Sequence, residues 1–290
     1  MKKNLIFSKN IIFSIKSNKY TKEEFDFLIT AKEKMPWITP FHEPGIVNLL
    51  LHECKNNKPQ KEAFSKLLQN VKDLKIEDAQ IFLNEALNYL LNVIQIPNQH
   101  DTLFIGEAQE GKADGCMTVL NIINSTGLYR NSVRKTTEKN LHSYFAYQKK
   151  HKAALNNIII FDDFTGTGDK ASRLILSAME YYPNAKIVFL TLATLNRGKQ
   201  RIESTFPNIL FLHGFEVRSA SQIKTLRRHI DIVRDYEAKV LSIGESYQGG
   251  YKNSQVLFFF SGHRAPNNVF SSLWWNKYKN GKERKSVFVR

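Results

Sequence analysis

The chain has 290 residues, 42% of them hydrophobic, which is enough to bury an α/β core in one large domain or one with an appendage. This composition excludes collagen-like, coiled-coil and disordered proteins. A net charge of +15 and a pI near 9.6 favour a polyanionic partner, such as nucleic acid or a phosphorylated metabolite.

The sequence carries no sign of a disulfide framework or a membrane segment. Cys54 and Cys116 lie far apart without a CxxC or Cys/His cluster, and we interpret them as ordinary thiols of a reducing cytosol. The first residues resemble a signal peptide, but Lys9, Asn10 and Lys16 interrupt the apolar run. Since no segment reaches the roughly 18 uncharged apolar residues of a membrane span, we expect a cytoplasmic protein without membrane contact.

Residues 1–96 have helical patterning. Apolar residues recur at spacings of three and four between Ala79 and Leu91, which predicts a helix with one buried face. Shorter helical patterns cover about 21–34, 43–54 and 60–71. We therefore expect residues 1–96 to form a helical cap region that packs on the rest of the chain.

After Pro97, short apolar runs alternate with helical patterns. The runs cover residues 102–105, 158–161, 186–193, 208–215 and 255–260. Because they are apolar on both faces, they indicate central strands covered on each side by helices, as in a parallel sheet. The order predicts a doubly wound, mainly parallel α/β domain over residues 97–262, followed by a basic and aromatic tail over 263–290.

The segment "IIIFDDFTGTGDK" is the strongest candidate for a ligand site. Asp162 and Asp163 follow an apolar strand, at the edge where such sheets bind ligands. The loop that follows leads into a helix N-terminus, where N–H groups and the helix dipole favour an anion; it comprises Thr165, Gly166, Thr167, Gly168, Asp169 and Lys170. The two carboxylates could accept hydrogen bonds from sugar hydroxyls or approach a divalent metal. The alternative is a tight strand-to-helix turn capped by Thr and Asp.

Spacing separates this loop from two better-known phosphate motifs. A P-loop requires Gly-Lys-Ser/Thr, whereas Lys170 follows Gly-Asp and precedes Ala171. A dinucleotide fingerprint has the pattern G-x-G-x-x-G, and Ala171 stands at the position of the third glycine. That pattern also usually lacks a preceding acidic pair, so it fits this segment less well.

The same segment resembles the signature of type I phosphoribosyltransferases, in which an apolar strand ends in two acids before a Thr-Gly loop. The resemblance implies that Asp162 and Asp163 face the ribose hydroxyls of phosphoribosyl pyrophosphate, with substrate-bound Mg²⁺ close to both acids. It also implies that residues 165–170 hold the 5′-phosphate. Two positions depart from the family pattern: Gly166 stands where an acid or Thr is common, and Lys170 replaces a frequent closing Thr.

A second glycine-containing segment, "TLFIGEAQEGKADG" at 102–115, has the form expected of a pyrophosphate loop upstream of the acidic pair. Its candidate residues are Glu107, Gly111 and Lys112; the alternative is a glycine-rich loop before a helix. Residues 128–156 follow, with seven Lys+Arg against one Glu. In phosphoribosyltransferases this interval holds a mobile loop, but a solvated basic helix or a nucleic-acid surface with stacking aromatics would have the same composition.

The C-terminal segment "GHRAPNNVFSSLWW" supplies candidates for the acceptor side of the site. Arg264 suits phosphate, Asn267 and Asn268 can read amide or base edges, and Trp274 can stack on a base. The alternative is a turn whose Trp side chains cover the core. The segment resembles phosphoribosyltransferase-like proteins of bacterial conflict systems, which implies an antiphage role and, for retron loci, a reverse transcriptase partner with its RNA or DNA product. We assign no role to His213.

Three hypotheses follow. The first is a phosphoribosyltransferase-like effector that transfers or hydrolyses the phosphoribosyl group of phosphoribosyl pyrophosphate or a related nucleotide. The second is a non-catalytic sensor of such a ligand that binds nucleic acid through its basic surface. The third is a structural partner in a defence complex, which leaves the acidic pair unexplained.

Overall fold

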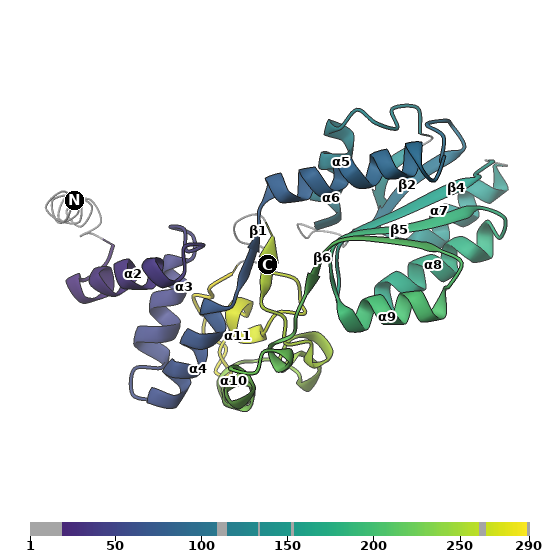
Figure 1. Ribbon diagram of the computed structural model, residues 1–290. Helices are drawn as coiled ribbons and strands as arrows, with labels where there is room; N and C mark the ends of the chain where they lie inside the picture. The colour runs from purple at the N-terminus through teal and green to yellow at the C-terminus, as the bar shows by residue number, and fades with distance from the viewer. Residues whose placement is uncertain (1–18, 109–114, 133, 152–153, 261–264, 289–290) are drawn as a thin grey trace, which may run out of the picture. The chain divides into compact units, whose positions relative to one another are not determined.

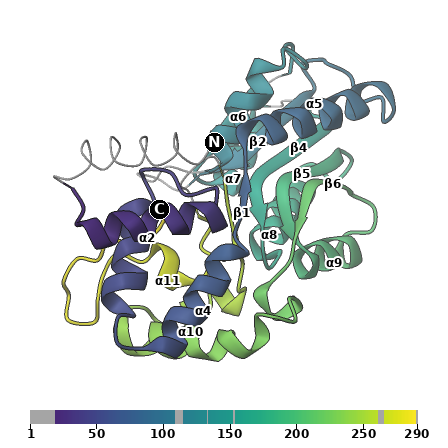
Figure 2. The ribbon, with the colours of Figure 1, turned by 60° about the vertical axis from the view of Figure 1, so that its left-hand side comes forward.

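The computed structural model describes residues 19–108, 115–132, 134–151, 154–260 and 265–288. The chain forms two compact units, one made of Met1–Asp73 with Ala220–Arg290 and the other of Leu74–Ser219 (Figures 1 and 2). The first unit contains segments from both ends of the chain. The regions expected from the sequence are instead consecutive, with boundaries at residues 96 and 262. In the described ranges, no helix is both long and apolar enough to cross a membrane.

The unit Leu74–Ser219 is built on a five-stranded parallel sheet with the strand order β3-β2-β4-β5-β6. The strands are β2 (Thr102–Glu107), β3 (Arg134–Glu138), β4 (Asn157–Thr165), β5 (Lys186–Leu195) and β6 (Leu210–Val217). Four of them coincide largely with apolar runs of the sequence. The predicted fold class, a mainly parallel α/β sheet flanked by helices, is thereby confirmed.

Helices cover both faces of this sheet (Figure 1). On one face lie α5 (Ile76–Asn92) and α6 (Gly115–Ser125); on the other lie α7 (Leu141–Lys150), α8 (Asp169–Tyr181) and α9 (Asn196–Thr205). Helix α8 turns Ala171, Leu174 and Ile175 toward the sheet, and all three are buried. Coverage on both sides explains why the central strands are apolar at every position rather than at alternate ones.

Two elements of the sheet differ from the expectation. The run 255–260 was expected to be a central strand, but its residues Phe258–Phe260 form β7, which pairs with β1 (Lys72–Leu74) in a separate two-stranded sheet. Phe259 there packs against Trp37 and Phe288, so the run is apolar because it enters an aromatic cluster. Conversely, β3 has the polar sequence RKTTE and was not expected, because an edge strand needs no apolar face.

The other unit is mainly helical. Its helices are α2 (Lys22–Lys34), α3 (Glu43–Val47), a π-helical turn (Asn48–Glu53), α4 (Lys58–Gln69), α10 (Arg227–Val240) and α11 (Ser271–Trp274), with short 3₁₀ turns at Ala220–Gln222, Glu245–Tyr247 and Tyr251–Asn253. A capping box starts α2, in which the Thr21 hydroxyl accepts from the Glu24 N–H and the Glu24 carboxylate accepts from the Thr21 N–H. The helical patterns at 21–34, 43–54 and 60–71 are confirmed.

A buried ion pair connects the early and late segments of this unit. The Glu53 carboxylate, at the end of the π-helical turn, accepts from Arg284 Nε at 2.8 Å and Nη2 at 2.9 Å, and from the hydroxyls of Tyr236 and Tyr278. The Arg284 side chain is fully buried. Burial by itself would raise the pKa of Glu53, but the hydrogen bonds and charge of Arg284, with the two tyrosines, lower it below the usual value.

We predict that Glu53→Gln lowers the free energy of unfolding by about 3 kcal/mol, because it leaves the Arg284 charge buried without its partner. The matched control is Lys239→Ala, which removes an exposed pair with Asp235 and should change stability by less than about 0.5 kcal/mol. Urea unfolding of both variants measures the difference. Equal changes in the free energy of unfolding for the two substitutions would show that the buried Glu53–Arg284 pair does not stabilise the unit more than an exposed ion pair does.

Candidate functional site

The two acids of the signature lie at the carboxyl edge of the central strand β4, on opposite faces of the sheet. Side chains alternate along a strand, so Asp162 shares the face of Ile158 and Ile160, which pack toward α8. Asp163 takes the other face, toward α6. The acidic pair is therefore divided between two environments.

Asp162 is buried and surrounded by donors. Its carboxylate accepts from Lys170 Nζ, which lies 3.1 Å from each of the two oxygens, and from the Cys116 thiol at 3.1 Å. The backbone N–H of Asp163 donates to Asp162 Oδ1 at 3.0 Å. These contacts come from α8, from α6 and from β4 itself, and together they allow a carboxylate to be buried at this edge.

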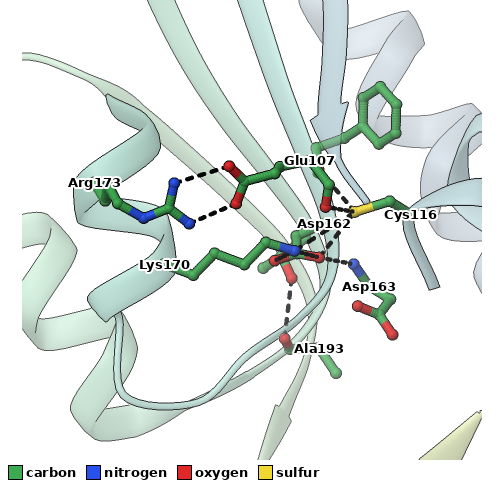
Figure 3. A network of polar contacts seen from close by, with 9 residues as sticks. Glu107, Cys116, Asp162, Asp163, Lys170, Arg173 and Ala193 are labelled. Atoms are coloured by element: carbon green, nitrogen blue, oxygen red, sulfur yellow. Dashed lines mark hydrogen bonds and ion pairs between the residues drawn. The ribbon is translucent and has the colours of Figure 1, made fainter. Parts of the chain in front are cut away.

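Asp163 rests against the first residue of α6. In Figure 3 its carboxylate points away from Lys170, and a Cβ atom built on Gly115 would overlap it. Glycine is therefore required where α6 begins, since any side chain there would displace the Asp163 carboxylate. The Asp163 side chain is partly exposed, whereas Asp162 is buried and pairs with Lys170.

The Thr/Gly loop curls between the first turns of α8 and α9. Gly168 precedes α8 in the left-handed conformation, with φ of +79°, which glycine adopts without strain. Asp169 pairs with Arg201 of α9 and accepts from the Thr167 hydroxyl at 2.7 Å. A Cβ atom on Gly198 of α9 would lie 2.6 Å from the carbonyl oxygen of Gly166 in the loop. These contacts hold the loop in a defined shape.

Two hydroxyls at the loop are buried without a hydrogen-bond partner among the residues that the structure describes. They belong to Thr165, the last residue of β4, and to Ser172, in the first turn of α8. A buried hydroxyl without a partner costs free energy. The first N–H groups of a helix also lack intrahelical acceptors, so this end of α8 is suited to an added acceptor such as a phosphate.

A second ion pair lies beside the first. Glu107, at the end of β2, accepts from Arg173 of α8 at 2.8 and 2.5 Å, one N–H for each oxygen. The hydrogen bond to Glu107 raises the pKa of Arg173, and the charges of Glu107 and Asp162 act in the same direction. Figure 3 shows Lys170 and Arg173 reaching from α8 to the ends of two neighbouring strands.

The structure brings most of the predicted residues together. Glu107, Asp162, Asp163 and the loop 165–170 occupy one edge of the sheet. Gly111, Lys112 and Arg264 lie outside the described residues. Asn267, Asn268 and Trp274 belong to the other unit, where the Asn268 amide donates to the Ser254 hydroxyl at 2.8 Å and the Trp274 indole to the Val269 carbonyl at 3.0 Å. Their part in ligand binding stays a prediction.

Three residues of the site were missed in the sequence. Cys116, Arg173 and Arg201 each bind an acid that is 46, 66 or 32 positions away along the chain. One signal was available for Arg173, because Lys170 and Arg173 are three residues apart in a helix that starts at the acidic strand end. Cys116 and Arg201 carry no such signal.

The Asp162 carboxylate does not fit a metal site held by the protein. Mg²⁺ demands near-octahedral oxygen ligands, yet both oxygens of Asp162 already contact the Lys170 ammonium. Across the described ranges, His, Cys, Asp and Glu nowhere gather in a group of three or more that could hold a metal ion.

Comparison with known proteins identifies the family. A family model described as PRTase-CE matches residues 52–290, and the chain belongs to this family. No curated protein matches the chain.

Solved structures also match. One is the AQ2163 protein from Aquifex aeolicus, with 12% identity, a TM-score of 0.34, and coverage of 62% of this chain and 86% of that one. Another is the xanthine-guanine-hypoxanthine phosphoribosyltransferase of Helicobacter pylori, with 13% identity, a TM-score of 0.29, and coverage of 54% and 94%.

We predict that Gly115→Ala destabilises the protein by about 1–3 kcal/mol, because the added methyl group overlaps the Asp163 carboxylate and forces it to move. Gly244→Ala is the control, since a Cβ atom there meets nothing within 4 Å. Denaturant unfolding compares the two. An unchanged midpoint for Gly115→Ala would mean that Asp163 does not rest on α6.

Proposed function

We propose that this member of the PRTase-CE family binds phosphoribosyl pyrophosphate or a related nucleotide at the edge of β4. The loop 165–170 would hold the 5′-phosphate, and Asp162 and Asp163 would orient the ribose. Glu107, Gly111 and Lys112 would form the pyrophosphate side. Mg²⁺ would arrive as part of the substrate, bound to its pyrophosphate.

The observation that carries the proposal is the junction of β4 with α8. The buried strand β4 carries two acids near its carboxyl end, and the glycine-containing loop then brings the N-terminus of α8 to the same edge of the sheet. The helix end favours an anion, while carboxylates beside it favour hydroxyl donors. A sugar phosphate carries both kinds of group, a phosphate anion and sugar hydroxyls, in one small molecule.

The unpartnered hydroxyls support a phosphate in particular. Thr165 is the first residue of the loop and Ser172 follows it on α8, and phosphate oxygens can accept hydrogen bonds from both hydroxyls and from backbone N–H groups. The loop is already shaped by Gly168, by the Asp169–Arg201 pair and by the close approach of Gly198. Binding would therefore cost little ordering of the backbone.

We propose further that the protein transfers or hydrolyses the phosphoribosyl group. The reaction would pass through a cationic sugar at C1′, as in glycoside hydrolysis, and the carboxylates would hold the ribose while the pyrophosphate departs. The resemblance of the C-terminal segment to conflict-system proteins supports a role as an antiphage effector. A reverse transcriptase with its RNA or DNA product is the partner that this role suggests.

The second candidate is a non-catalytic sensor that also binds nucleic acid. It is favoured by the basic interval around β3 and α7, where Tyr147 exposes 57% of its surface and Arg134 lies 5.6 Å from the ring of the buried Tyr144. Lys149 and Lys150 are exposed at the end of α7. Basic groups interleaved with aromatic rings are typical of surfaces that bind single strands.

We expect the purified protein to bind ribose 5-phosphate and phosphoribosyl pyrophosphate in isothermal titration calorimetry. Asp163→Asn should weaken ribose 5-phosphate binding about tenfold or more, because a hydrogen bond to a charged acceptor contributes about 1.5–3 kcal/mol. Asp231→Asn, at an exposed position of α10, is the matched control and should leave binding unchanged. Absence of binding of both ligands to the wild type would refute the proposed site.

Turnover separates the two candidates. An effector consumes phosphoribosyl pyrophosphate or a nucleotide, and Asp162→Asn/Asp163→Asn abolishes this consumption in metabolite profiling after induced expression. A sensor binds the ligand without consuming it, and its affinity for nucleic acid falls steeply with salt. Ligand binding without turnover and without salt-dependent nucleic-acid binding would contradict both.

A further inference from the structure

The side chain of Lys170 turns back from the first turn of α8 onto the acidic pair. Here Lys170 Nζ lies 3.1 Å from each of the two oxygens of Asp162. The lysine side chain is 38% exposed and the aspartate side chain 4% exposed, so the pair joins a buried carboxylate to a cation at the protein surface.

This arrangement occupies the carboxylate that a metal would need. Besides Lys170, the Cys116 thiol and the Asp163 N–H donate to Asp162 Oδ1. A divalent ion could bind Asp162 only by displacing the ammonium or by lying beside it, and two neighbouring cations repel each other strongly away from bulk water. The pairing therefore opposes a metal at this carboxylate.

Glu107, at the end of the neighbouring strand β2, is also paired with a cation from α8. Arg173 lies three residues after Lys170 on α8 and binds both oxygens of Glu107, whose side chain is 14% exposed. Lys170 and Arg173, both from α8, thus pair with the acids at the ends of β4 and β2 (Figure 3). The protein itself supplies positive charge to the acids at this edge of the sheet.

We propose that Lys170 is a built-in counter-ion that replaces a protein-held divalent metal at Asp162. The ammonium compensates the charge of the Asp162 carboxylate from within the protein. The inference rests on the proposed function for its ligand. It follows that a sugar phosphate without pyrophosphate binds this site without Mg²⁺.

The first experiment uses wild-type protein and ribose 5-phosphate, which lacks the pyrophosphate that itself binds Mg²⁺. Calorimetric titrations in excess Mg²⁺ and in excess EDTA should give dissociation constants that agree within about twofold, since no metal bridges the sugar and the protein. A loss of about tenfold or more in EDTA would overturn the proposal and leave the proposed function intact. A wild type that binds neither ribose 5-phosphate nor phosphoribosyl pyrophosphate defeats the proposed function instead.

The second experiment uses Mn²⁺ alone and does not depend on the ligand. Electron paramagnetic resonance measures the concentration of free Mn²⁺, and the wild type and Lys170→Arg, which keeps the cation, should bind no more Mn²⁺ than Asp162→Asn. Lys170→Met should bind Mn²⁺ at least about tenfold more tightly than the wild type, because Asp162 is then available to the ion. Asp162→Asn in the Lys170→Met background should abolish this gain.

Circular dichroism establishes that each variant is folded. If Lys170→Met does not fold, the comparison of wild type with Asp162→Asn decides, because equal Mn²⁺ binding by the two supports the proposal. Mn²⁺ binding by the wild type that is lost in Asp162→Asn would overturn it.

Discussion

The buried carboxylate of Asp162 is the constraint around which the site is arranged. A carboxylate at the end of a central strand loses its water, and this loss must be offset by donors and opposite charge. Three neighbours supply them: Lys170 from α8, Cys116 from α6, and the N–H of Asp163. The first turns of α6 and α8 therefore both contact β4 at Asp162.

The remaining features of the edge follow from this arrangement. Since α6 begins beside β4, its first residue must be a glycine to leave room for the Asp163 carboxylate. Since α8 turns Lys170 inward, Arg173 lies on the same side of the helix and meets Glu107 on β2. The loop between β4 and α8 must then close tightly, which Gly168 allows through its positive φ.

The same physical rule operates in the other unit. Glu53 and Arg284 are buried as a pair, and two tyrosine hydroxyls complete the hydrogen bonds of the carboxylate. The pair connects a helical turn near residue 50 with a segment near the end of the chain. In both units, therefore, a buried acid connects chain segments that are distant in sequence.

Much of the fold could be predicted from the sequence, because strands buried on both faces have continuous apolar runs. The run before Asp162 placed the acidic pair and the loop correctly at a strand end, next to a helix N-terminus. The polar edge strand β3 has no such run and was missed. The run ending at Phe260 was assigned to the wrong sheet, since an aromatic cluster and a central strand have the same local pattern.

The contacts that define the site could not be predicted in this way. Lys170 was expected to hold phosphate, and its pairing with Asp162 depends on how the first turn of α8 faces the strand. Cys116, Arg173 and Arg201 bind acids that are far away in sequence. Periodicity describes which face of an element is buried, but it does not say which charged groups meet at the end of a sheet.

The most direct test of this account is a crystal structure of the protein with ribose 5-phosphate, grown in the presence of EDTA. The account predicts the phosphate on the backbone N–H groups of residues 166–170, the ribose hydroxyls on Asp163, and Lys170 still paired with Asp162. A sugar phosphate bound elsewhere, or a Lys170 side chain that has left Asp162, would contradict it.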